Sequence, residues 1–370
     1  MRTPHDRDEG GSPVSTRTCL VTGGAGFIGC AVSRGLADDF DRVVVLDNLH
    51  PQIHPQPLRP AALDERVELV VGDVASAADW DALLADVEPD TVLHLAAETG
   101  TGQSLTESSR HARTNVVGTS EMLDAFRRSG RLPRRIVLTS SRAVYGEGAW
   151  RRQDGTLHYP GPRPQAMLER GEWDHPGAVP VPMAAATVAP APASVYGATK
   201  LAQEHLVTLW ADAHGVEAVV LRLQNVYGPG QSLINPYTGI MSLFCRLARE
   251  GRSIPLYEDG EVRRDFVIVD DVADAVLAAT RVPAPGPEPI DIGSGSWRTI
   301  AQAAGIVAQT YGAPEPQVTG QFRPGDVRHA WADVSRAREV LDWTPRVGVD
   351  EGLRRLASWI DEVLGADRRG

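Results

Sequence analysis

The sequence is short of lysine and of cysteine. Lys200 stands alone beside 36 arginines, and a lysine ammonium can lose a proton that an arginine guanidinium keeps. The three cysteines, Cys19, Cys30 and Cys245, have no CxxC spacing, which argues against a disulfide framework or a cysteine zinc site and fits a reducing cytoplasm. No apolar run reaches the ~20 residues that a membrane helix needs, so we expect no membrane partner.

An excess of basic residues is also missing. The net charge is −11, so nucleic acid is not an expected partner. Residues 1–16 are polar and charged and contain no apolar signal segment, which predicts a disordered tail. The 370 residues, 42% of them hydrophobic, are enough for one large globular domain or two modest ones.

Short apolar segments alternate with helical patterns along the chain. Continuous apolar strands separated by helices predict a parallel sheet that is covered on both faces. The expected fold class is α/β, with a doubly wound parallel sheet of the Rossmann type and a smaller C-terminal domain for the substrate. The first domain is predicted at 17–224 and 266–282, and the second at 225–265 and 289–370. The predicted strands lie at 18–22, 42–46, 67–71, 91–95, 135–139, 217–222 and 289–293.

A glycine-rich turn joins the first predicted strand to a helix. Gly23, Gly26 and Gly29 allow a tight turn and let the main chain approach a pyrophosphate at the helix N-terminus. The second strand ends at Asp47, 18 residues after Gly29, where a carboxylate would accept hydrogen bonds from an adenosine ribose. Asn48 follows, and no arginine stands there to hold a 2′-phosphate. NAD is therefore the expected cofactor, rather than NADP.

A tyrosine and the single lysine stand one helical turn apart. Tyr196 and Lys200 share one face of a predicted helix, where the ammonium would stabilise a phenolate and lower the tyrosine pKa. Such a phenol is a general base toward a hydroxyl and a general acid toward a carbonyl. Ser141 would project from the carboxyl end of the fifth strand, where doubly wound sheets bind ligands. These three residues are the predicted catalytic set.

These motifs and their order resemble the extended short-chain dehydrogenase/reductase family, and within it the NAD-dependent nucleotide-sugar epimerases and dehydratases. The resemblance extends over roughly 17–365 and implies an NAD-binding domain completed by a substrate-binding domain. It implies that Ser141, Tyr196 and Lys200 are catalytic. The cofactor-binding residues that it implies are Gly23, Gly26, Phe27, Ile28, Gly29, Asp47, Asn48, Asp73, Val74, Leu95, Ala96, Ala97, Asn115, Tyr196 and Lys200.

The same resemblance implies a binding site for a nucleotide sugar. Arg264 and Arg323 lie in two arginine segments that would hold the substrate diphosphate, a task that suits bidentate guanidinium groups. The loop at 94–104 resembles the substrate loop of dTDP-L-rhamnose 4-epimerase-like sequences. The substrate-binding residues implied in this way are Thr99, Gln103, Ser104, Ser141, Arg142, Asn225, Arg264 and Arg323.

The two residues after Ser141 restrict the reactions that the site is expected to catalyse. Dehydratases of this family carry Asp-Glu where this chain has Arg142 and Ala143, and related decarboxylases use a glutamate in this stretch. The side chains present support oxidation and reduction, but neither loss of water nor decarboxylation. The predicted function is NAD-dependent 4-epimerisation of a dTDP- or UDP-hexose. The alternatives are a ketoreductase that acts on a nucleotide-linked 4-keto-6-deoxysugar, and a non-catalytic NAD-binding sensor.

The sequence also gives predictions for an insertion and for a pair of long helices. The stretch 146–192 is predicted to be an insertion that shapes or covers the sugar pocket. Relatives often carry cysteine pairs there, whereas this chain has none, and His158 and His175 alone do not make a zinc site, so no metal is expected. The helical patterns at 108–129 and 195–213 resemble the helices that pair family dimers, which predicts a homodimer.

Overall fold

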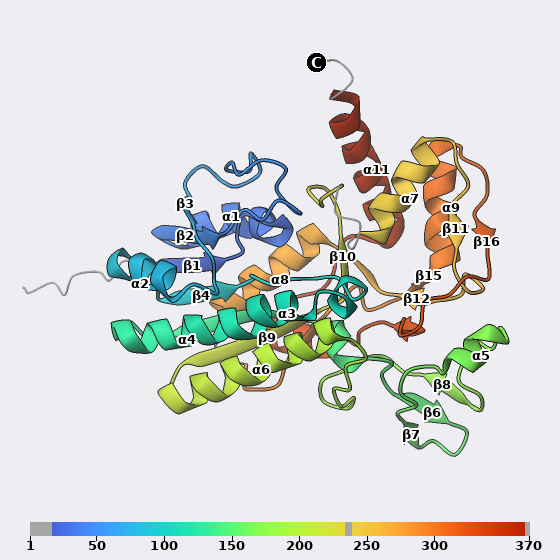
Figure 1. Ribbon diagram of the computed structural model, residues 1–370, viewed down its shortest axis with the longest axis horizontal. Coiled ribbons are helices and arrows are strands. Elements are labelled where there is room, and N and C mark those ends of the chain that lie inside the picture. Colours follow the sequence, from blue (N-terminus) through green and yellow to red (C-terminus); the bar gives the residue numbers. More distant parts are fainter. Residues whose placement is uncertain (1–16, 234–238, 284, 367–370) are drawn as a thin grey trace, which may run out of the picture.

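A parallel sheet forms the centre of the larger part of the molecule (Figure 1). The computed structural model describes residues 17–233, 239–283 and 285–366, so the predicted tail at 1–16 lies outside the described residues. Every neighbouring pair in the sheet is parallel. In spatial order the strands are β14 (Ile290–Ile292), β9 (Glu217–Leu223), β5 (Arg135–Ser141), β4 (Thr91–His94), β1 (Thr18–Thr22), β2 (Arg42–Asp47) and β3 (Glu68–Val71).

The central strands are buried along nearly their whole length. β1 and β4 bury every residue, and β2 buries all but its first, as continuous apolar strands covered on both faces should. The chain runs outward from β1 to β3 and then returns past β1 to β4, so the strand order reverses between β1 and β4. Open α/β sheets bind ligands beyond the carboxyl ends of the strands at such a switch point.

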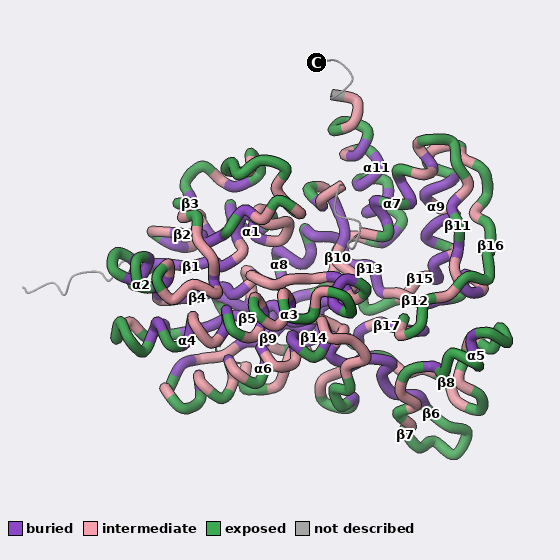
Figure 2. The backbone as a smooth tube through the Cα atoms, in the orientation of Figure 1, coloured by how far each residue is buried: buried purple, intermediate pink, exposed green. Residues whose placement is uncertain are grey.

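Helices cover both faces of the sheet, and a hydrophobic cluster lies under each layer. Figure 2 shows that the backbone between the layers is largely buried. α1 (Phe27–Asp39) packs beside α8 (Val269–Arg281) on one face. On the other face, α4 (Gly118–Ser129) lies between α2 (Ala77–Asp86) and α6 (Val195–His214). The doubly wound α/β fold predicted from the alternating pattern is confirmed.

The predicted helix at 108–129 is interrupted by a wider turn. α3 (Ser108–His111) leads into a π-helical turn at Ala112–Val117, and α4 follows directly. Asn115 in this turn accepts a hydrogen bond from the Glu98 main-chain N–H and donates one back to the Glu98 carbonyl. The π-turn therefore fixes the loop after β4, which forms part of the site described below.

A smaller unit lies beside the sheet, on the right of Figure 1. α7 (Ile240–Arg249), α9 (Ile300–Tyr311) and α11 (Val349–Ala366) enclose a hydrophobic cluster of their own, while α10 (Ser335–Leu341) packs on α8. Its short strands pair as β10 (Asn225–Tyr227) with β13 (Phe266–Ile268), β11 (Pro255–Leu256) with β16 (Gln317–Val318), and β12 (Arg263–Arg264) with both β15 (Arg298–Thr299) and β17 (His329–Ala330).

The stretch 146–192, predicted as an insertion, folds into a small unit of its own. β6 (Trp150–Arg152) pairs with β7 (Leu157–His158) and β8 (Ala178–Pro180) in an antiparallel sheet. In the sequence, α5 (Gln165–Glu169) follows β7 and precedes β8. Figure 1 shows this unit below the smaller domain.

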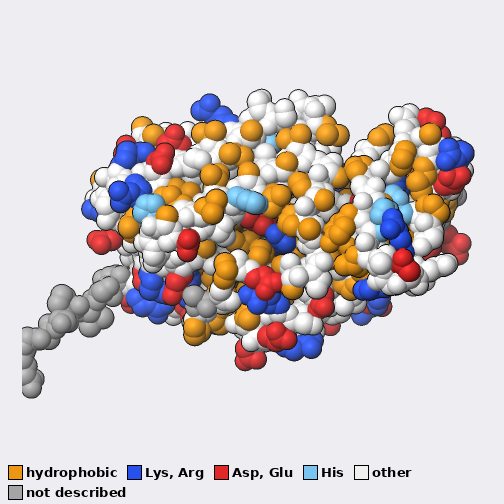
Figure 3. Space-filling model, turned by 90° about the horizontal axis from the view of Figure 1, so that it is seen from below, with side chains coloured by type: hydrophobic (Ala, Val, Ile, Leu, Met, Phe, Trp, Pro, Cys, Tyr) orange, Lys and Arg blue, Asp and Glu red, His pale blue; other side chains and the backbone are white. Residues whose placement is uncertain are grey.

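The surface mixes both charge signs. Figure 3 shows acidic and basic side chains interspersed over the face of the molecule that is seen from below. Among the described residues, no helix combines the length and the apolar character needed to cross a membrane. All three cysteines are free thiols.

Candidate active site

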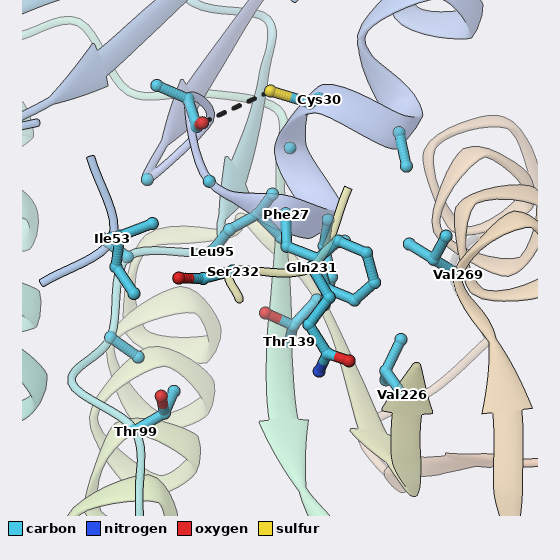
Figure 4. A pocket seen from close by; sticks show the side chains of 18 of the residues that line it. Phe27, Cys30, Ile53, Leu95, Thr99, Thr139, Val226, Gln231, Ser232 and Val269 are labelled. Carbon is cyan, nitrogen blue, oxygen red and sulfur yellow. Dashed lines mark hydrogen bonds between the residues drawn. The ribbon is translucent and has the colours of Figure 1, made fainter. Parts of the chain in front are cut away.

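A cavity of about 830 Å³ opens beyond the carboxyl ends of the central strands. Its volume lies in the range of small-molecule and cofactor sites, ~300–1,000 Å³. Phe27, at the start of α1, projects into the cavity, with Ile53 on one side and Val226 and Val269 on the other (Figure 4). The cavity thus lies at the switch point of the sheet.

The turn between β1 and α1 has no room for side chains. Gly23 has φ +67°, and a Cβ there would lie 2.7 Å from main-chain atoms of Ala96. A Cβ on Gly29 would lie 2.3 Å from the Gly24 carbonyl oxygen. The N-cap residue of α1, Gly26, has no side chain to cap the helix, and the first N–H groups of a helix have no partner within it. The residues of this turn line the cavity. This main-chain cradle fits the pyrophosphate of a dinucleotide.

Asp47 ends β2 at the rim of the cavity. Its carboxylate accepts hydrogen bonds from the N–H groups of Ala25 and Leu49, at 3.0 and 2.9 Å. The imidazole Nε2 of His54 lies 3.9 Å from the same carboxylate. A fixed negative charge here suits a ribose diol and would repel a 2′-phosphate. The other predicted cofactor residues that line the cavity are Phe27, Ile28, Asn48, Val74, Leu95, Ala96 and Ala97.

Four predicted site residues direct their side chains to protein groups instead. The Asp73 carboxylate accepts the Ala75 N–H, and the Asn115 amide is bound to Glu98 and Thr199. Gln103 is buried and exchanges hydrogen bonds with Gln52, while Ser104 Oγ donates to the Thr101 carbonyl. None of these four residues lines the cavity, although Gln52 and Glu98, to which two of them are bonded, do.

Ser141, Tyr196 and Lys200 come together on one wall of the cavity. Ser141 is the last residue of β5; its Oγ accepts the Ala143 N–H at 3.1 Å, and its hydroxyl lies near enough to the Tyr196 phenol to lower the pKa of that group. Ser194 caps α6 by accepting the Gly197 N–H at 3.0 Å, which fixes the helical turn that carries Tyr196. Thr99 and Asn225 line the same cavity. The structure therefore unites the residues expected for proton transfer with two of those expected to contact the sugar.

The protonation of this group departs from the sequence-based expectation. Burial raises the pKa of Tyr196, and the Ser141 hydrogen bond and the positive charge of Arg142 oppose that rise. Burial lowers the pKa of Lys200 to about 7. The expectation that Lys200 leaves Tyr196 with a lowered pKa is wrong for the chain alone, because the cost of burying a phenolate outweighs the favourable contacts.

A buried hydrogen-bond network behind Lys200 was missed in the sequence. Lys200 Nζ donates to Gln203 Oε1 at 2.6 Å, and Gln203 Nε2 donates to Thr119 Oγ1 at 2.8 Å. His94 Nε2 lies 3.1 Å from Gln203 Nε2, and His94 Nδ1 lies 2.6 Å from Thr22 Oγ1. Burial lowers the pKa of His94 to about 3, so the imidazole is neutral. Gln203 follows Lys200 by three residues, a same-face spacing that could have drawn attention to it.

A second, smaller cavity of about 40 Å³ lies beyond the Ser141–Arg142 turn. Arg142, Arg264 and Asp326 are among the residues that line it. Arg142 Nε donates to Asn225 Oδ1 at 2.7 Å, which connects the two cavities. Arg323 is exposed, and its guanidinium lies 5.0 Å from the ring centre of Tyr257. The predicted diphosphate ligands are thus split between this cavity and the adjacent surface.

Buried ion pairs join the 146–192 unit to the smaller domain. Arg163 donates to both oxygens of Glu258, at 2.7 and 2.8 Å, and both side chains are buried. The buried Arg328 also reaches the unit, because its Nε donates to Asp174 Oδ1 at 2.9 Å. No residue of 146–192 is among those that line the large cavity, and only Gly146 lines the small one. The unit therefore lies beside the large cavity and does not cover it, whereas its predicted role in shaping the sugar pocket stays a prediction.

The sequence matches known proteins over nearly its whole length. Residues 19–167 and 175–293 match the NAD dependent epimerase/dehydratase family. The chain belongs to this family. The resemblance drawn from the motifs is thereby confirmed, and the short gap in the match falls inside the 146–192 unit.

Two curated members of the epimerase/dehydratase family show how far the similarity extends. The dTDP-L-rhamnose 4-epimerase of Burkholderia thailandensis is 56% identical over 357 residues, which cover 96% of this chain and 98% of that protein. The UDP-glucose 4-epimerase of Mycolicibacterium smegmatis is 32% identical, over 92% of this chain and 97% of that protein.

Solved epimerase structures have the same architecture. The UDP-glucose 4-epimerase of Thermotoga maritima, solved with UDP-glucose, has a TM-score of 0.78 at 28% identity, over 94% of this chain and 99% of that chain. The UDP-glucose 4-epimerase of Thermus thermophilus, in complex with NAD, has a TM-score of 0.72 at 26% identity, over 92% of this chain and 98% of that chain. The family and these neighbours agree with NAD as the cofactor.

Proposed function

We propose that this epimerase/dehydratase family member is an NAD-dependent nucleotide-sugar 4-epimerase and that its substrate is dTDP-L-rhamnose. The observation that carries the proposal is the convergence of Ser141, Tyr196 and Lys200 on one cavity with the glycine cradle. The 56% identity to a dTDP-L-rhamnose 4-epimerase supports the choice of sugar nucleotide. A UDP-hexose is the next candidate, from the more distant relatives.

The chain's own residues supply proton transfer at C4. NAD, when bound along the glycine turn, supplies a reversible acceptor for the hydride of the sugar C4. Tyr196 Oη takes the proton of the 4-hydroxyl and later returns it. Ser141 Oγ donates a hydrogen bond to the oxygen that becomes a carbonyl. Lys200 in its charged form favours the phenolate of Tyr196 and restores the basicity that burial alone removes.

Inversion at C4 also requires the 4-keto sugar to turn while the nucleotide stays bound. We assign the anchoring role to Arg264 and Arg323 at the diphosphate, and contacts with the hexose to Thr99 and Asn225. Arg142 and Ala143 provide no carboxylate for the elimination of water. The proposed reaction is therefore redox-neutral and stops at the C4 epimer, dTDP-6-deoxy-L-talose.

Turnover of the proposed substrate tests the assignment. The NAD-loaded protein is incubated with dTDP-L-rhamnose and no added NADH, and the sugar nucleotides are separated by chromatography and identified by NMR. We expect an equilibrium mixture of the two C4 epimers. If the protein converts UDP-hexoses but not dTDP-L-rhamnose, the substrate is a UDP-hexose and the proposed sugar nucleotide is wrong. Stoichiometric consumption of NAD(P)H with a 4-keto sugar would support the ketoreductase, and no conversion of any sugar nucleotide would support the NAD-binding sensor.

We also propose that the protein is a cytoplasmic homodimer. α4 and α6 pack side by side, and Leu209 on α6 is 69% exposed. These two elements are the helices whose sequence patterns resemble the dimer-forming helices of this family, and Leu209 places an apolar side chain on their exposed surface. Three free thiols fit a reducing compartment. Light scattering should give the mass of two chains, and a Leu209→Asp variant the mass of one; a single-chain mass for the unchanged protein would contradict the dimer.

A further inference from the structure

Arg142 uses one of its three side-chain nitrogens for hydrogen bonding within 17–233, 239–283 and 285–366. Its Nε donates to Asn225 Oδ1 at 2.7 Å, and neither Nη atom donates to any group in those ranges. The side chain is partly buried and lines the small cavity. The N–H groups at the free end of Arg142 are therefore available to an acceptor from outside the protein, and a hydrogen bond from a charged donor is stronger than one from a neutral donor.

The same small cavity holds a second arginine. Arg264 also lines it, and burial together with the positive charge of Arg142 lowers the pKa of Arg264 to about 9. Asp326, Glu147 and Glu258 are the acidic groups that act on this pair. Two guanidinium groups that repel each other at low dielectric are stabilised when an anion lies between them. The cavity is therefore suited to an anionic oxygen.

Arg264 has few donors left for such an anion. Its Nη1 donates to the main-chain carbonyls of Arg263 and Arg328, and its Nη2 donates to the Val327 carbonyl. These bonds hold Arg264 against the segment that leads into β17. Arg264 thus contributes mainly charge to the cavity, whereas Arg142 contributes charge and unused N–H groups.

Arg142 is also close to the site of proton transfer. It directly follows Ser141, on the 3₁₀ turn Arg142–Tyr145, and its charge acts on the Tyr196 phenol. A group that reaches both Tyr196 and Arg264 lies between the reacting C4 oxygen and the diphosphate anchor. In a nucleoside-diphosphate hexose, the β-phosphate is the anionic group that is bonded to the sugar itself.

We propose that Arg142 is a substrate-binding residue that donates hydrogen bonds from its Nη atoms to the β-phosphate of the nucleotide sugar, opposite Arg264. The inference rests on the proposed function, because it places the hexose at Tyr196. It makes Arg142 a specificity determinant for nucleoside diphosphates over monophosphates. Arg142 acts through charge-assisted hydrogen bonds, which are stronger than neutral ones.

A pair of nucleotides that differ in the β-phosphate tests this role. Calorimetry on the NAD-loaded protein gives the Kd of dTDP and of dTMP for the unchanged chain and for Arg142→Gln. We expect dTDP to bind roughly 10- to 100-fold more weakly to the variant, the scale of hydrogen bonds to a charged group, and dTMP to bind as before. Arg142→Lys, which keeps the charge, should lose less. Arg354→Gln, an exposed charge change on α11, is the matched control and should leave both Kd values unchanged.

The outcomes separate this inference from the proposed function. Equal dTDP affinity in the unchanged chain and Arg142→Gln would overturn the role of Arg142, as would an equal loss for dTDP and dTMP. If thermal denaturation shows that the glutamine variant is unfolded, the Kd values of dTDP and dTMP are compared for the lysine variant instead. A protein that epimerises dTDP-L-rhamnose but binds dTDP independently of Arg142 contradicts this inference alone. A protein that shows the Arg142 effect without epimerising contradicts the proposed function alone.

Discussion

The cofactor half and the substrate half of the site are built from different materials. In the cofactor half, main-chain atoms of the turn at 23–29 form the cradle, and one carboxylate, Asp47, lies at the end of the next strand. In the substrate half, side chains from distant segments meet: Arg142 pairs with Asn225, 83 residues away, and the unit that adjoins this half is held by Arg163, which pairs with Glu258, 95 residues away. Adding a side chain to the cofactor half should therefore weaken NAD binding. Removing a side chain from the substrate half or its support should lower turnover or stability.

The largest expected effect lies where the two halves meet. Tyr196→Phe removes the proton acceptor for the 4-hydroxyl while the ring still fills its place. We expect kcat to fall by ~10²- to 10⁴-fold, with the NAD content of the purified protein unchanged. Steady-state kinetics and the absorbance of bound cofactor measure both. Tyr159→Phe, on the exposed surface of the 146–192 unit, is the matched control; an equal rate in both variants would show that the base is misassigned.

The second-largest effect is expected from removal of a buried side chain that supports the substrate half from the adjoining 146–192 unit. Arg163→Met leaves Glu258 buried with one fewer partner, so the free energy of unfolding in urea should fall by about 3 kcal/mol, the lower end of the range for broken buried pairs. The lower end applies because Arg328 still donates to Glu258. Arg170→Met, which breaks the exposed pair with Glu172, should cost less than ~1 kcal/mol. Similar losses in the two variants would contradict the anchoring role of Arg163.

Addition of a side chain to the cofactor half should cost somewhat less. Gly23→Ala forces a Cβ against the main chain of Ala96 at a left-handed φ, a strain of ~1–3 kcal/mol, and should weaken NAD binding measured by titration. Gly305→Ala is the control, because a Cβ on this residue of α9 meets nothing within 4 Å. That variant should keep its NAD affinity and gain up to ~1 kcal/mol in stability. Unchanged NAD affinity in Gly23→Ala would remove the argument for a main-chain cradle.

The smallest effect concerns pH. Burial raises the pKa of Asp291 from its ordinary value of 3.8 to about 7, although Tyr145 Oη donates to both carboxylate oxygens. The folded chain therefore keeps a proton that the unfolded chain releases, so this contribution to stability is present at low pH and is lost as the pH rises through 7. The stability difference between the unchanged chain and Asp291→Asn should fall by up to ~1.4 kcal/mol per pH unit between pH 5 and 7. A constant difference would contradict the raised pKa.

The contrast between the two halves also explains what the sequence could predict. The seven strands of the main sheet follow from continuous apolar runs, and the Gly23–Gly29 turn and the Tyr196–Lys200 pair follow from spacing within a few residues. The fold, the family and the cofactor inferred from them are confirmed. These features are local in sequence, so a single chain displays them directly.

The remaining features depend on contacts between distant residues. The antiparallel sheet in 146–192 and the Lys200–Gln203–His94 network form only when segments far apart in the chain meet. The same holds for the direction of individual side chains: Gln103 was expected to face the hexose, but its amide pairs with Gln52. Sequence spacing placed such residues near the site without giving the direction of their side chains.

The most direct measurement follows the hydrogen at C4 of the sugar. dTDP-L-rhamnose with deuterium at C4 is incubated with the NAD-loaded protein in ordinary water, with no added NADH, and the product is examined by NMR and mass spectrometry. The account predicts the C4 epimer with its deuterium still at C4 and with no loss of water. Product that carries protium at C4, or that forms only with an equimolar supply of reduced cofactor, would contradict it.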